Sequence, residues 1–299
     1  MPDVGPDDVL IEVEIAGVGS WDPFEREGGY AALLGARPRF PYVLGSEGSG
    51  VVREVGSRVQ RFAPHDRVYA GAFLNPKGGF YAEYAVVPQG QVSKMPPGMD
   101  PVQAGAMSGV AATALRGLED TLRLRSGESL LLFGASGGIG HTAVQLAKRM
   151  GARVFAVASG ADGVALVEKL GADVGVNGRG AGVNEAARTF APSGFDAALV
   201  TGSSPQTAEL LPNVRDGGRV AFPTGVQPAP EARPGITVTA YNGEPDADLV
   251  ARLNTWIGRG PFEVHVAETF PLEEAARAHA ALDQHYLGKL ALVVGGRRV

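Results

Sequence analysis

The stretch that most constrains the fold runs from residue 130 to 148, where an apolar run enters a glycine cluster and then a helical pattern. Leu130 to Phe133 has the composition of a buried strand, and Val144 and Ala147 have the spacing of one helix face. A strand, a tight turn and a helix N-terminus direct free backbone N–H groups and the positive end of the helix dipole at one place. The stretch therefore predicts a phosphate-binding turn.

The glycine cluster fits the dinucleotide fingerprint Gly-x-Gly-x-x-Gly, with Ala135 in the place of the first glycine. Gly137 lets the backbone approach a pyrophosphate, and Gly140 lets the helix pack closely on the strand. The alternative is a glycine-rich turn without a ligand, but the strand and helix on either side favour a dinucleotide. The residues expected to bind its pyrophosphate are Ala135, Ser136, Gly137, Gly138 and Ile139.

Composition excludes several classes of protein. The 299 residues allow two domains, and 20% charged with 44% hydrophobic residues is ordinary for a soluble chain. A net charge of −5 without a Lys/Arg cluster argues against a nucleic-acid surface. We expect a cytoplasmic location, because there is neither a membrane-length apolar run nor a signal peptide pattern. With no cysteine, no disulfide, thiolate nucleophile or cysteine-based zinc site can form.

The pattern changes near residue 100. Before it, short strands separated by Gly and Pro predict a barrel-like or rolled β domain, with a turn into a short helix at residues 20–26. Strands are expected there at residues 9–15 (half-exposed, by alternation), 41–52, 66–70 and 80–87.

After residue 100, strands alternate with helices, which predicts right-handed βαβ units and a doubly wound parallel sheet of the α/β class. A helix is expected at 104–118, and six strands at 130–133, 153–158, 173–176, 195–201, 219–222 and 236–240. The last elements do not extend this sheet and are assigned to the first domain: a helix at 249–257, a strand at 264–270, a helix from 271 and a strand at 290–294. The expected domains are 1–100 with 243–299, and 101–242.

Several motifs occur together in this chain: Gly45-Ser46-Glu47-Gly48-Ser49-Gly50-Val51-Val52, Asp66-Arg67-Val68, Gly79-Phe80-Tyr81-Ala82-Glu83-Tyr84, the glycine turn, Gly217-Gly218-Arg219-Val220, and Gly288-Lys289. With them the chain resembles the medium-chain dehydrogenase/reductase superfamily, in its zinc-free quinone oxidoreductase and zeta-crystallin branch. The resemblance covers nearly the whole chain. It implies a Rossmann-type nucleotide-binding domain, a mostly β GroES-like catalytic domain made of both chain ends, and a homodimer joined through the nucleotide-binding sheets.

The chain departs from this family at several positions. Gly19 replaces a common asparagine, and Phe24 replaces a tyrosine that some members carry near the substrate. Gly178 replaces a tyrosine that often lines the adenosine pocket, which leaves Asn177 and Arg179 beside it.

Two other kinds of enzyme, a zinc alcohol dehydrogenase and a serine hydrolase, fit this sequence poorly. Zinc alcohol dehydrogenases of this superfamily take a histidine ligand from Gly-His-Glu, but here the sequence is Gly45-Ser46-Glu47, and no metal is expected. The histidines show no ligand spacing and are expected to be surface or packing residues: His65, His141, His265, His279 and His285. A hydrolase is disfavoured, because Ser136 lacks the Gly-x-Ser-x-Gly order.

Further site residues follow from the resemblance and from strand ends, where ligands bind in such sheets. The resemblance places Thr113 near the nicotinamide carboxamide; the alternative is a helix threonine bonded to its own backbone. The other expected cofactor contacts follow strands of the sheet: Thr201, Gly202, Pro223, Thr224, Gly225, Ala240, Tyr241 and Asn242.

The sequence leaves two interpretations open for each of two side chains, Tyr241 and Lys289. Tyr241 is the predicted catalytic hydroxyl that polarises or protonates a substrate, but a packed aromatic at a domain junction fits equally well. Lys289 is predicted to reach the phosphate edge of the cofactor, and the alternative is a solvated lysine at a strand start.

The cofactor is predicted to be NADPH. An acidic residue at the end of the second strand holds the ribose of NAD, but here that end is Ser159-Gly160, which can donate to a 2′-phosphate and leave room for it. Arg179 could add a charge-assisted contact. Asp162, three residues after Ser159, favours NADH instead, because its carboxylate could turn back to the ribose hydroxyl.

The predicted function is NADPH-dependent reduction of quinones or other α,β-unsaturated carbonyl compounds without zinc. One alternative is an enoyl-thioester reductase of polyketide or fatty-acid type. The other is a structural or regulatory protein that binds NADPH without turnover.

Overall fold

A computed structural model describes residues 1–35, 40–202, 204–231 and 233–295. It divides into two compact units. The first unit comprises Met1–Gly109, Glu244–Asn254 and Val264–Val299, and the second comprises Val110–Gly243 and Thr255–Glu263. The boundaries predicted from the sequence lie at 100 and 243, and residues 255–263 were not expected in the second unit.

The first unit is built on a seven-stranded sheet with the order β12-β13-β1-β2-β3-β5, in which β4 also pairs with β1. β1 is antiparallel to β2, β4 and β13. Both ends of the chain therefore meet in one sheet, as expected. The strands are β1 (Asp8–Val18), β2 (Glu47–Val55), β3 (Arg67–Gly71), β4 (Tyr84–Pro88), β5 (Val92–Lys94), β12 (Val266–Pro271) and β13 (Lys289–Val293).

The alternation expected for the first strand is confirmed at Glu12 and Glu14, which are partly exposed between buried residues, but it fails at Leu10. Val9, Ile11, Val13 and Ile15 are buried as predicted, but Leu10 on the opposite face is also buried. β1 is an interior strand of the sheet, with β2 along one edge and β4 followed by β13 along the other, and both of its faces are covered at Leu10 and Ile11. A periodicity of two shows which residues share a face, and only packing shows whether the other face is covered.

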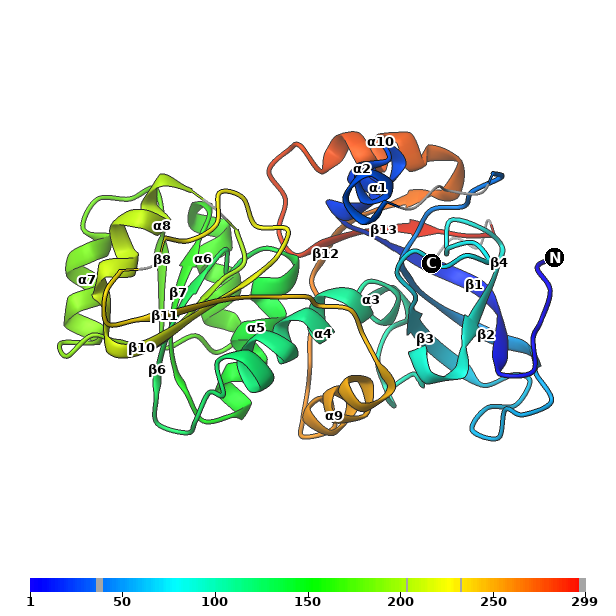
Figure 1. Cartoon of the computed structure of the whole chain (residues 1–299), viewed down its shortest axis with the longest axis horizontal. Coiled ribbons are helices and arrows are strands. Elements are labelled where there is room, and N and C mark those ends of the chain that lie inside the picture. Colours follow the sequence, from blue (N-terminus) through cyan, green and yellow to red (C-terminus); the bar gives the residue numbers. More distant parts are fainter. Residues whose placement is uncertain (36–39, 203, 232, 296–299) are drawn as a thin grey trace. The chain divides into compact units, whose positions relative to one another are not determined.

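Helices complete the first unit and lead into the second. The helix expected at 104–118 is broken into α3, α4 and a π-helical segment, η2. In Figure 1, α1 and α10 lie close together, and a hydrogen bond between Arg26 and His279 joins them. The helical elements are α1 (Trp21–Arg26), α2 (Gly29–Leu34), η1 (Gln89–Gln91), α3 (Pro101–Gly105), α4 (Ser108–Leu115), η2 (Arg116–Thr121), α9 (Ala247–Ile257), η4 (Leu272–Glu274) and α10 (Ala275–Ala281).

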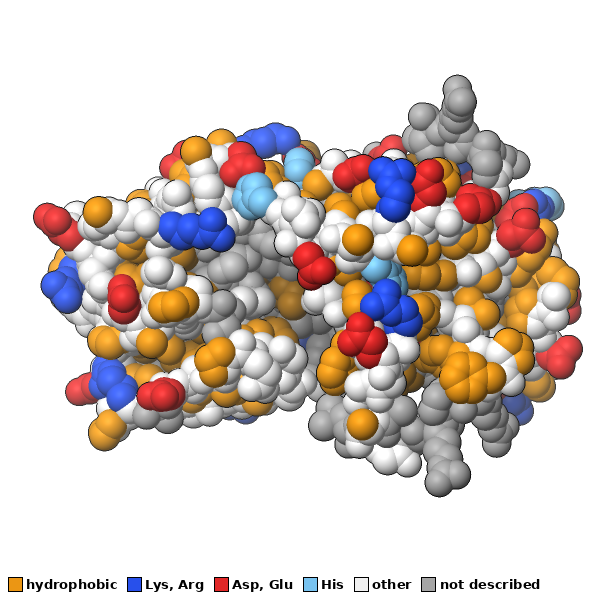
Figure 2. All heavy atoms as spheres, turned by 90° about the horizontal axis from the view of Figure 1, so that it is seen from above, with side chains coloured by type: hydrophobic (Ala, Val, Ile, Leu, Met, Phe, Trp, Pro, Cys, Tyr) orange, Lys and Arg blue, Asp and Glu red, His pale blue; other side chains and the backbone are white. Residues whose placement is uncertain are grey.

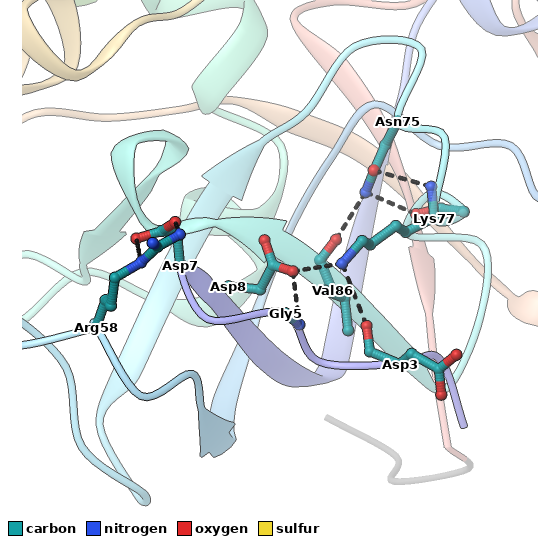
Figure 3. A network of polar contacts seen from close by, with 9 residues as sticks. Asp3, Gly5, Asp7, Asp8, Arg58, Asn75, Lys77 and Val86 are labelled. Atoms are coloured by element: carbon teal, nitrogen blue, oxygen red, sulfur yellow. Dashed lines mark hydrogen bonds and ion pairs between the residues drawn. The ribbon is translucent and has the colours of Figure 1, made fainter.

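A polar network holds the residues before β1 against the loop before β4 (Figure 3). The carboxylate of Asp8 accepts hydrogen bonds from the backbone N–H of Gly5 and from the ammonium group of Lys77. Asn75 donates to the carbonyl of Val86 at 2.8 Å. The start of β1 is therefore held by side chains as well as by the sheet ladder.

The second unit is a six-stranded parallel sheet with the order β11-β10-β9-β6-β7-β8, which confirms the doubly wound fold. The chain runs outward from β6 to β8 and then crosses to β9, so the strand order reverses between β6 and β9. The strands are β6 (Ser129–Phe133), β7 (Arg153–Ala158), β8 (Val174–Asn177), β9 (Phe195–Val200), β10 (Val214–Pro223) and β11 (Thr237–Tyr241). The helical elements between them are α5 (Gly138–Arg149), α6 (Gly160–Lys169), α7 (Val183–Phe190), α8 (Pro205–Leu210) and η3 (Leu211–Asn213).

Surface charge is mixed where it can be seen. On the face drawn in Figure 2, acidic and basic side chains are interspersed among apolar ones. This face offers no broad basic area of the kind that binds nucleic acid. Over the described ranges, none of the helices has the length and apolar character needed to cross a membrane.

Candidate functional site

The glycine turn between β6 and α5 has the geometry that the fingerprint requires. Gly134 has a φ of 68°, in the left-handed region, and Gly137 N–H donates to its carbonyl at 3.0 Å. A Cβ atom on Gly140 would lie 2.1 Å from the carbonyl oxygen of Gly134. Only glycine at this position lets the helix pack this closely on the turn.

Gly137 lies in a different environment. A Cβ atom there would have the carbonyl oxygen of Gly134 as its nearest neighbour, at 3.4 Å, which is ordinary van der Waals contact. The backbone at Gly137 is therefore open on the side where a side chain would project. It also precedes the first turn of α5, whose N–H groups have no intrahelical partners. An open backbone at a helix N-terminus fits a pyrophosphate group.

Ser136 and Ser159 connect this turn to the end of β7. The two hydroxyl oxygens lie 3.3 Å apart, and the backbone N–H of Ser159 donates to Ser136 Oγ at 3.2 Å. Ser136 is buried. The structure therefore brings the predicted pyrophosphate residue and the predicted 2′-phosphate residue into direct contact.

The end of β8 lies beside the end of β7. The backbone N–H of Gly178 donates to the carbonyl of Ala158 at 2.9 Å, and that of Arg179 donates to Asn177 Oδ1 at 3.1 Å. Arg179 is exposed. Its side chain is thus on the surface close to the Ser159 turn, which is compatible with the predicted charge-assisted contact with a 2′-phosphate.

Thr201 lies at the reversal of strand order. Its hydroxyl donates to the carbonyl of Phe133 at 2.7 Å, at the end of β6. A Cβ atom on Gly134 would lie 2.7 Å from Thr201 Oγ1. The loop after β9 thus packs directly on the glycine turn, at the switch point where ligands bind in open α/β sheets.

The remaining predicted contacts of the second unit follow β10 and β11. The backbone N–H of Thr224 donates to the carbonyl of Tyr241 at 3.0 Å, which holds the two strand ends together. Thr113 Oγ1 donates to the carbonyl of Gly243 at 3.4 Å, so the threonine hydroxyl bonds across to the segment after β11. The predicted residues at these ends are Pro223, Thr224, Gly225, Ala240, Tyr241 and Asn242.

Tyr241 is a packed aromatic in this structure. Its hydroxyl is buried with no hydrogen-bond partner among the described residues, and a Cβ atom on Gly117 would lie 2.4 Å from it. Burial raises the pKa of the Tyr241 phenol, which makes it a weaker proton donor. Its catalytic role stays a prediction.

The first unit contains a buried ion pair between Glu47 and Lys289. The ammonium nitrogen lies 2.8 Å from Glu47 Oε1, and the side chains are 1% and 3% exposed. Glu47 Oε2 accepts from the backbone N–H of Gly109 at 2.6 Å, and Lys289 Nζ lies 4.4 Å from the centre of the Trp21 ring. Lys289 is therefore not a solvated lysine. Its predicted contact with the cofactor is untested, and Glu47 already neutralises its charge.

Asp22 lies beside this pair and is fully buried. Asp22 Oδ2 accepts from the backbone N–H of Gly19 at 2.7 Å. Burial is the main reason why the pKa of Asp22 is raised to about 7; Lys289 lowers it, and Glu47 and Glu25 raise it further. Because Glu47 already balances the one buried ammonium group, a second buried anion is unfavourable here.

Tyr81 and His279 extend the cluster toward the surface. Tyr81 Oη lies 3.2 Å from His279 Nε2, and Arg26 Nη1 lies 3.1 Å from His279 Nδ1. His279 is buried, as the packing interpretation expected. Burial, and then the charge of Arg26, lower the pKa of the His279 imidazole, which is therefore neutral near pH 7.

Asp22 and Tyr81 were not predicted as site residues, and Tyr81 was noted only as part of the motif at residues 79–84. The sequence offered no signal for Asp22, because an acidic residue in the first turn of a helix is ordinary. Apart from the ion-paired Glu47 Oε1 and Lys289 Nζ, four buried polar atoms in or next to this cluster have no hydrogen-bond partner among the described residues: Trp21 Nε1, Asp22 Oδ1, Glu25 Oε2 and Ser46 Oγ. Such atoms are rare in folded proteins.

No group of three or more metal-ligating side chains of the His, Cys, Asp and Glu types that could hold a metal occurs within the described residues. Ser46 stands where zinc dehydrogenases of the resembled superfamily carry histidine.

Comparison with known proteins decides the family. Residues 5–97 match the alcohol dehydrogenase GroES-like domain, and residues 138–240 match a model described as zinc-binding dehydrogenase. The quinone oxidoreductase of Rattus norvegicus is 30% identical over 298 residues, which cover 96% of this chain and 88% of that protein. The chain belongs to the quinone oxidoreductase branch of the medium-chain dehydrogenase/reductase family.

Other members of the family agree with this assignment. The chloroplastic NADPH-dependent alkenal/one oxidoreductase of Arabidopsis thaliana is 29% identical, covering 98% of this chain and 73% of that protein. Among solved structures, an NAD-dependent alcohol dehydrogenase superposes with a TM-score of 0.88 at 26% identity, covering 99% of this chain and 94% of that one. A mycobacterial protein complexed with NADPH superposes with a TM-score of 0.80 at 25% identity, covering 98% and 93%. A nicotinamide dinucleotide is therefore the cofactor class of this medium-chain reductase.

Proposed function

We propose that this medium-chain reductase uses NADPH to reduce quinones or other α,β-unsaturated carbonyl compounds. The observation that carries the proposal is the open backbone at Gly137, at the switch point of the sheet, in a chain whose relatives are named quinone and alkenal/one oxidoreductases. A nicotinamide, when bound, supplies the hydride.

The chain itself contributes binding and orientation. The N–H groups of the first turn of α5, with Gly137, would hold the pyrophosphate, and the helix dipole favours its negative charge. The Ser136–Ser159 contact fixes the loop after β7 against this turn. Thr201 fixes the loop after β9 in the same way. A rigid cradle of this kind orients the cofactor before any acceptor binds.

The proposal is tested by following NADPH oxidation with a panel of quinones, enones and enoyl thioesters. We expect turnover with quinones and enones. Turnover confined to enoyl thioesters would favour the polyketide or fatty-acid type of reductase. Tight NADPH binding with no turnover would make the protein a cofactor-binding module, and the proposal would be wrong.

Cofactor preference is expected to depend on Ser159. Its hydroxyl can donate to a 2′-phosphate, and exposed Arg179 lies on the neighbouring strand end. One contact of this kind contributes roughly 1.5–3 kcal/mol, or about ten- to a hundredfold in affinity. We expect a preference for NADPH over NADH that Ser159→Asp reverses, because a carboxylate repels the phosphate and accepts from the ribose hydroxyl. Titration of both cofactors by protein fluorescence measures this preference. Equal dissociation constants in the parent protein would show that Ser159 does not select the phosphate.

A homodimer is expected to form through β11, the edge strand of the second unit. Thr237, Thr239 and Ala240 are exposed along this strand, and an unpaired edge favours pairing with a second copy. We expect Thr239→Glu to shift the protein toward a monomer in light scattering, because two identical carboxylates would face each other across the two-fold axis. A parent protein that is monomeric at micromolar concentration would contradict this prediction.

A further inference from the structure

This inference concerns how the second unit recognises the ribose of its cofactor, and it rests on the proposed function. In a dinucleotide fold the ribose of the adenosine half lies at the end of the second strand, about 20 residues after the glycine turn. Ser159 has this place, because it directly follows β7 and contacts the glycine turn through Ser136. Any group that fixes the Ser159 side chain therefore affects the choice between NADPH and NADH.

We propose that Ser136 is a positioning residue for the 2′-phosphate of NADPH. Its buried hydroxyl donates to Ser159 Oγ and thereby directs the hydroxyl proton of Ser159 toward the phosphate. Gly163 leaves the space that the Ser136 hydroxyl occupies. From the sequence, Ser136 was expected to donate to the pyrophosphate, whereas its hydroxyl is assigned here to Ser159.

The Ser136 side chain lies against the end of β7 and the first turn of α6. It is 3% exposed. Its Oγ atom accepts from the backbone N–H of Ser159 at 3.2 Å and lies 3.3 Å from Ser159 Oγ. A buried hydroxyl must also place its own proton on an acceptor. Among the described residues, Ser159 Oγ is the acceptor in reach of that proton, so Ser136 donates and Ser159 Oγ accepts.

The hydroxyl proton of Ser159 is then available to a ligand. Ser159 is the N-cap residue of α6, but its side chain makes no capping hydrogen bond to that helix. A serine at this position usually accepts from a backbone N–H of the first turn. Ser159 is partly exposed, so its proton can reach a bound molecule. A donor directed outward favours a charged phosphate over a neutral ribose hydroxyl, because hydrogen bonds to charged groups are stronger.

Gly163 makes room for this arrangement. A Cβ atom on Gly163, in the first turn of α6, would lie 2.9 Å from Ser136 Oγ and 3.0 Å from Ser136 Cβ. The contact with Oγ is too short to persist, and the easiest relief is rotation of the Ser136 hydroxyl into another rotamer. That rotation takes Oγ away from its position beside Ser159. Alanine is otherwise a better helix former than glycine, so a loss caused by Gly163→Ala would not come from helix propensity.

Asp162 lies beside Gly163 and opposes a phosphate. It is exposed, and its Oδ1 atom accepts from the backbone N–H of Gly163 at 2.9 Å. Its charge is present in the parent protein and in the Ser136 variant alike. The size of the NADPH preference therefore depends on Asp162 as well, but the change in that preference when Ser136 is replaced does not.

The test compares the dissociation constants of NADPH and NADH, measured by fluorescence titration. We expect Ser136→Ala to weaken NADPH binding about fivefold and NADH binding less than about twofold, because only the phosphate contact depends on the direction of the Ser159 proton. Ser129→Ala is the matched control, since Ser129 is also a buried serine and its hydroxyl donates to Asp196 Oδ2 at 2.8 Å, at the start of β6. It should leave the ratio of the two constants unchanged. Equal losses for the two cofactors in Ser136→Ala, or no loss, would overturn the proposal.

Gly163→Ala gives a second test. It should lower the NADPH preference as much as Ser136→Ala does, while thermal unfolding without cofactor shows a folded protein. In the double variant the two losses should not add, because both substitutions act on the same hydroxyl. Gly90→Ala, whose Cβ would lie 3.7 Å from the Ala247 side chain, is the glycine control and should keep the parent ratio. Additive losses in the double variant would overturn the role assigned to Gly163.

The result is separate from the outcome for the proposed function. Dissociation constants need no acceptor, so a protein that binds NADPH but reduces no quinone or enone would refute the proposed function and still decide the role of Ser136. A protein that binds neither cofactor would overturn both. If Ser136→Ala does not fold, the ratio measured for Gly163→Ala decides the role of the Ser136 hydroxyl.

Discussion

Gly137→Asp should weaken NADPH binding more than about a hundredfold, equivalent to about 2.7 kcal/mol, while the protein stays folded. The new side chain fits without clash, because the nearest atom to its Cβ would be the carbonyl oxygen of Gly134 at 3.4 Å. Its carboxylate, however, would project where the pyrophosphate must approach and would oppose the favourable helix dipole. Fluorescence titration measures the loss, and thermal unfolding without cofactor measures the fold.

Two control variants show whether the loss of NADPH affinity in Gly137→Asp comes from the charge of the new side chain, from its bulk or from its position. Gly137→Ala adds the methyl group alone and should lose less affinity than the aspartate. Ala165→Asp adds the same charge to the exposed face of α6 and should bind NADPH like the parent protein. If Gly137→Asp is folded and binds NADPH within a few-fold of the parent, the phosphate site lies elsewhere.

Lys289→Met should lower the free energy of unfolding by about 3–5 kcal/mol, because it leaves the carboxylate of Glu47 buried without its cation. The pair is 1% and 3% exposed, so water cannot replace the ammonium group without rearrangement. For a protein of this size the loss corresponds to a fall in Tm of roughly 6–20 °C. Chemical denaturation and calorimetry measure both quantities.

The double variant Glu47→Gln/Lys289→Met should be less destabilised than Lys289→Met alone, since an uncharged amide is easier to bury. An exposed pair gives the comparison: Arg252→Met removes the partner of Asp248, which is 79% exposed, and should cost less than about 1 kcal/mol. If Lys289→Met were as stable as the parent protein, the negative charge of Glu47 would have to be compensated by something other than Lys289.

The nucleotide-binding half of the protein could be predicted because its signals are local. In the glycine turn the strand, the turn and the helix are contiguous, so the close packing at Gly140 could be predicted, whereas the left-handed backbone at Gly134 came from the structure. The alternation of strands and helices after residue 128 likewise gave the parallel sheet and its six strands. The helix from 104 to 118 was predicted as continuous, although Gly105 ends α3, Gly109 lies in the first turn of α4 and Gly117 lies in η2; a single glycine is tolerated inside a helix and does not by itself place a break.

The sequence alone could not show which charged side chains are buried or which groups they contact. Lys289 and His279 were interpreted from their neighbours in the chain, but their partners are distant: Tyr81 is 198 positions from His279, and Arg26 is 253 positions from it. Whether a carboxyl group like that of Asp22 is ionised depends on how much water the folded sheet and helices remove, and on which charges they place beside it. The sequence by itself determined the family, the two-domain architecture and the glycine turn, because these depend on contiguous residues and on periodicity. Only the tertiary structure decided the environment of Asp22, Glu47 and Lys289, because desolvation and pairing arise from contacts between segments that are far apart in the chain.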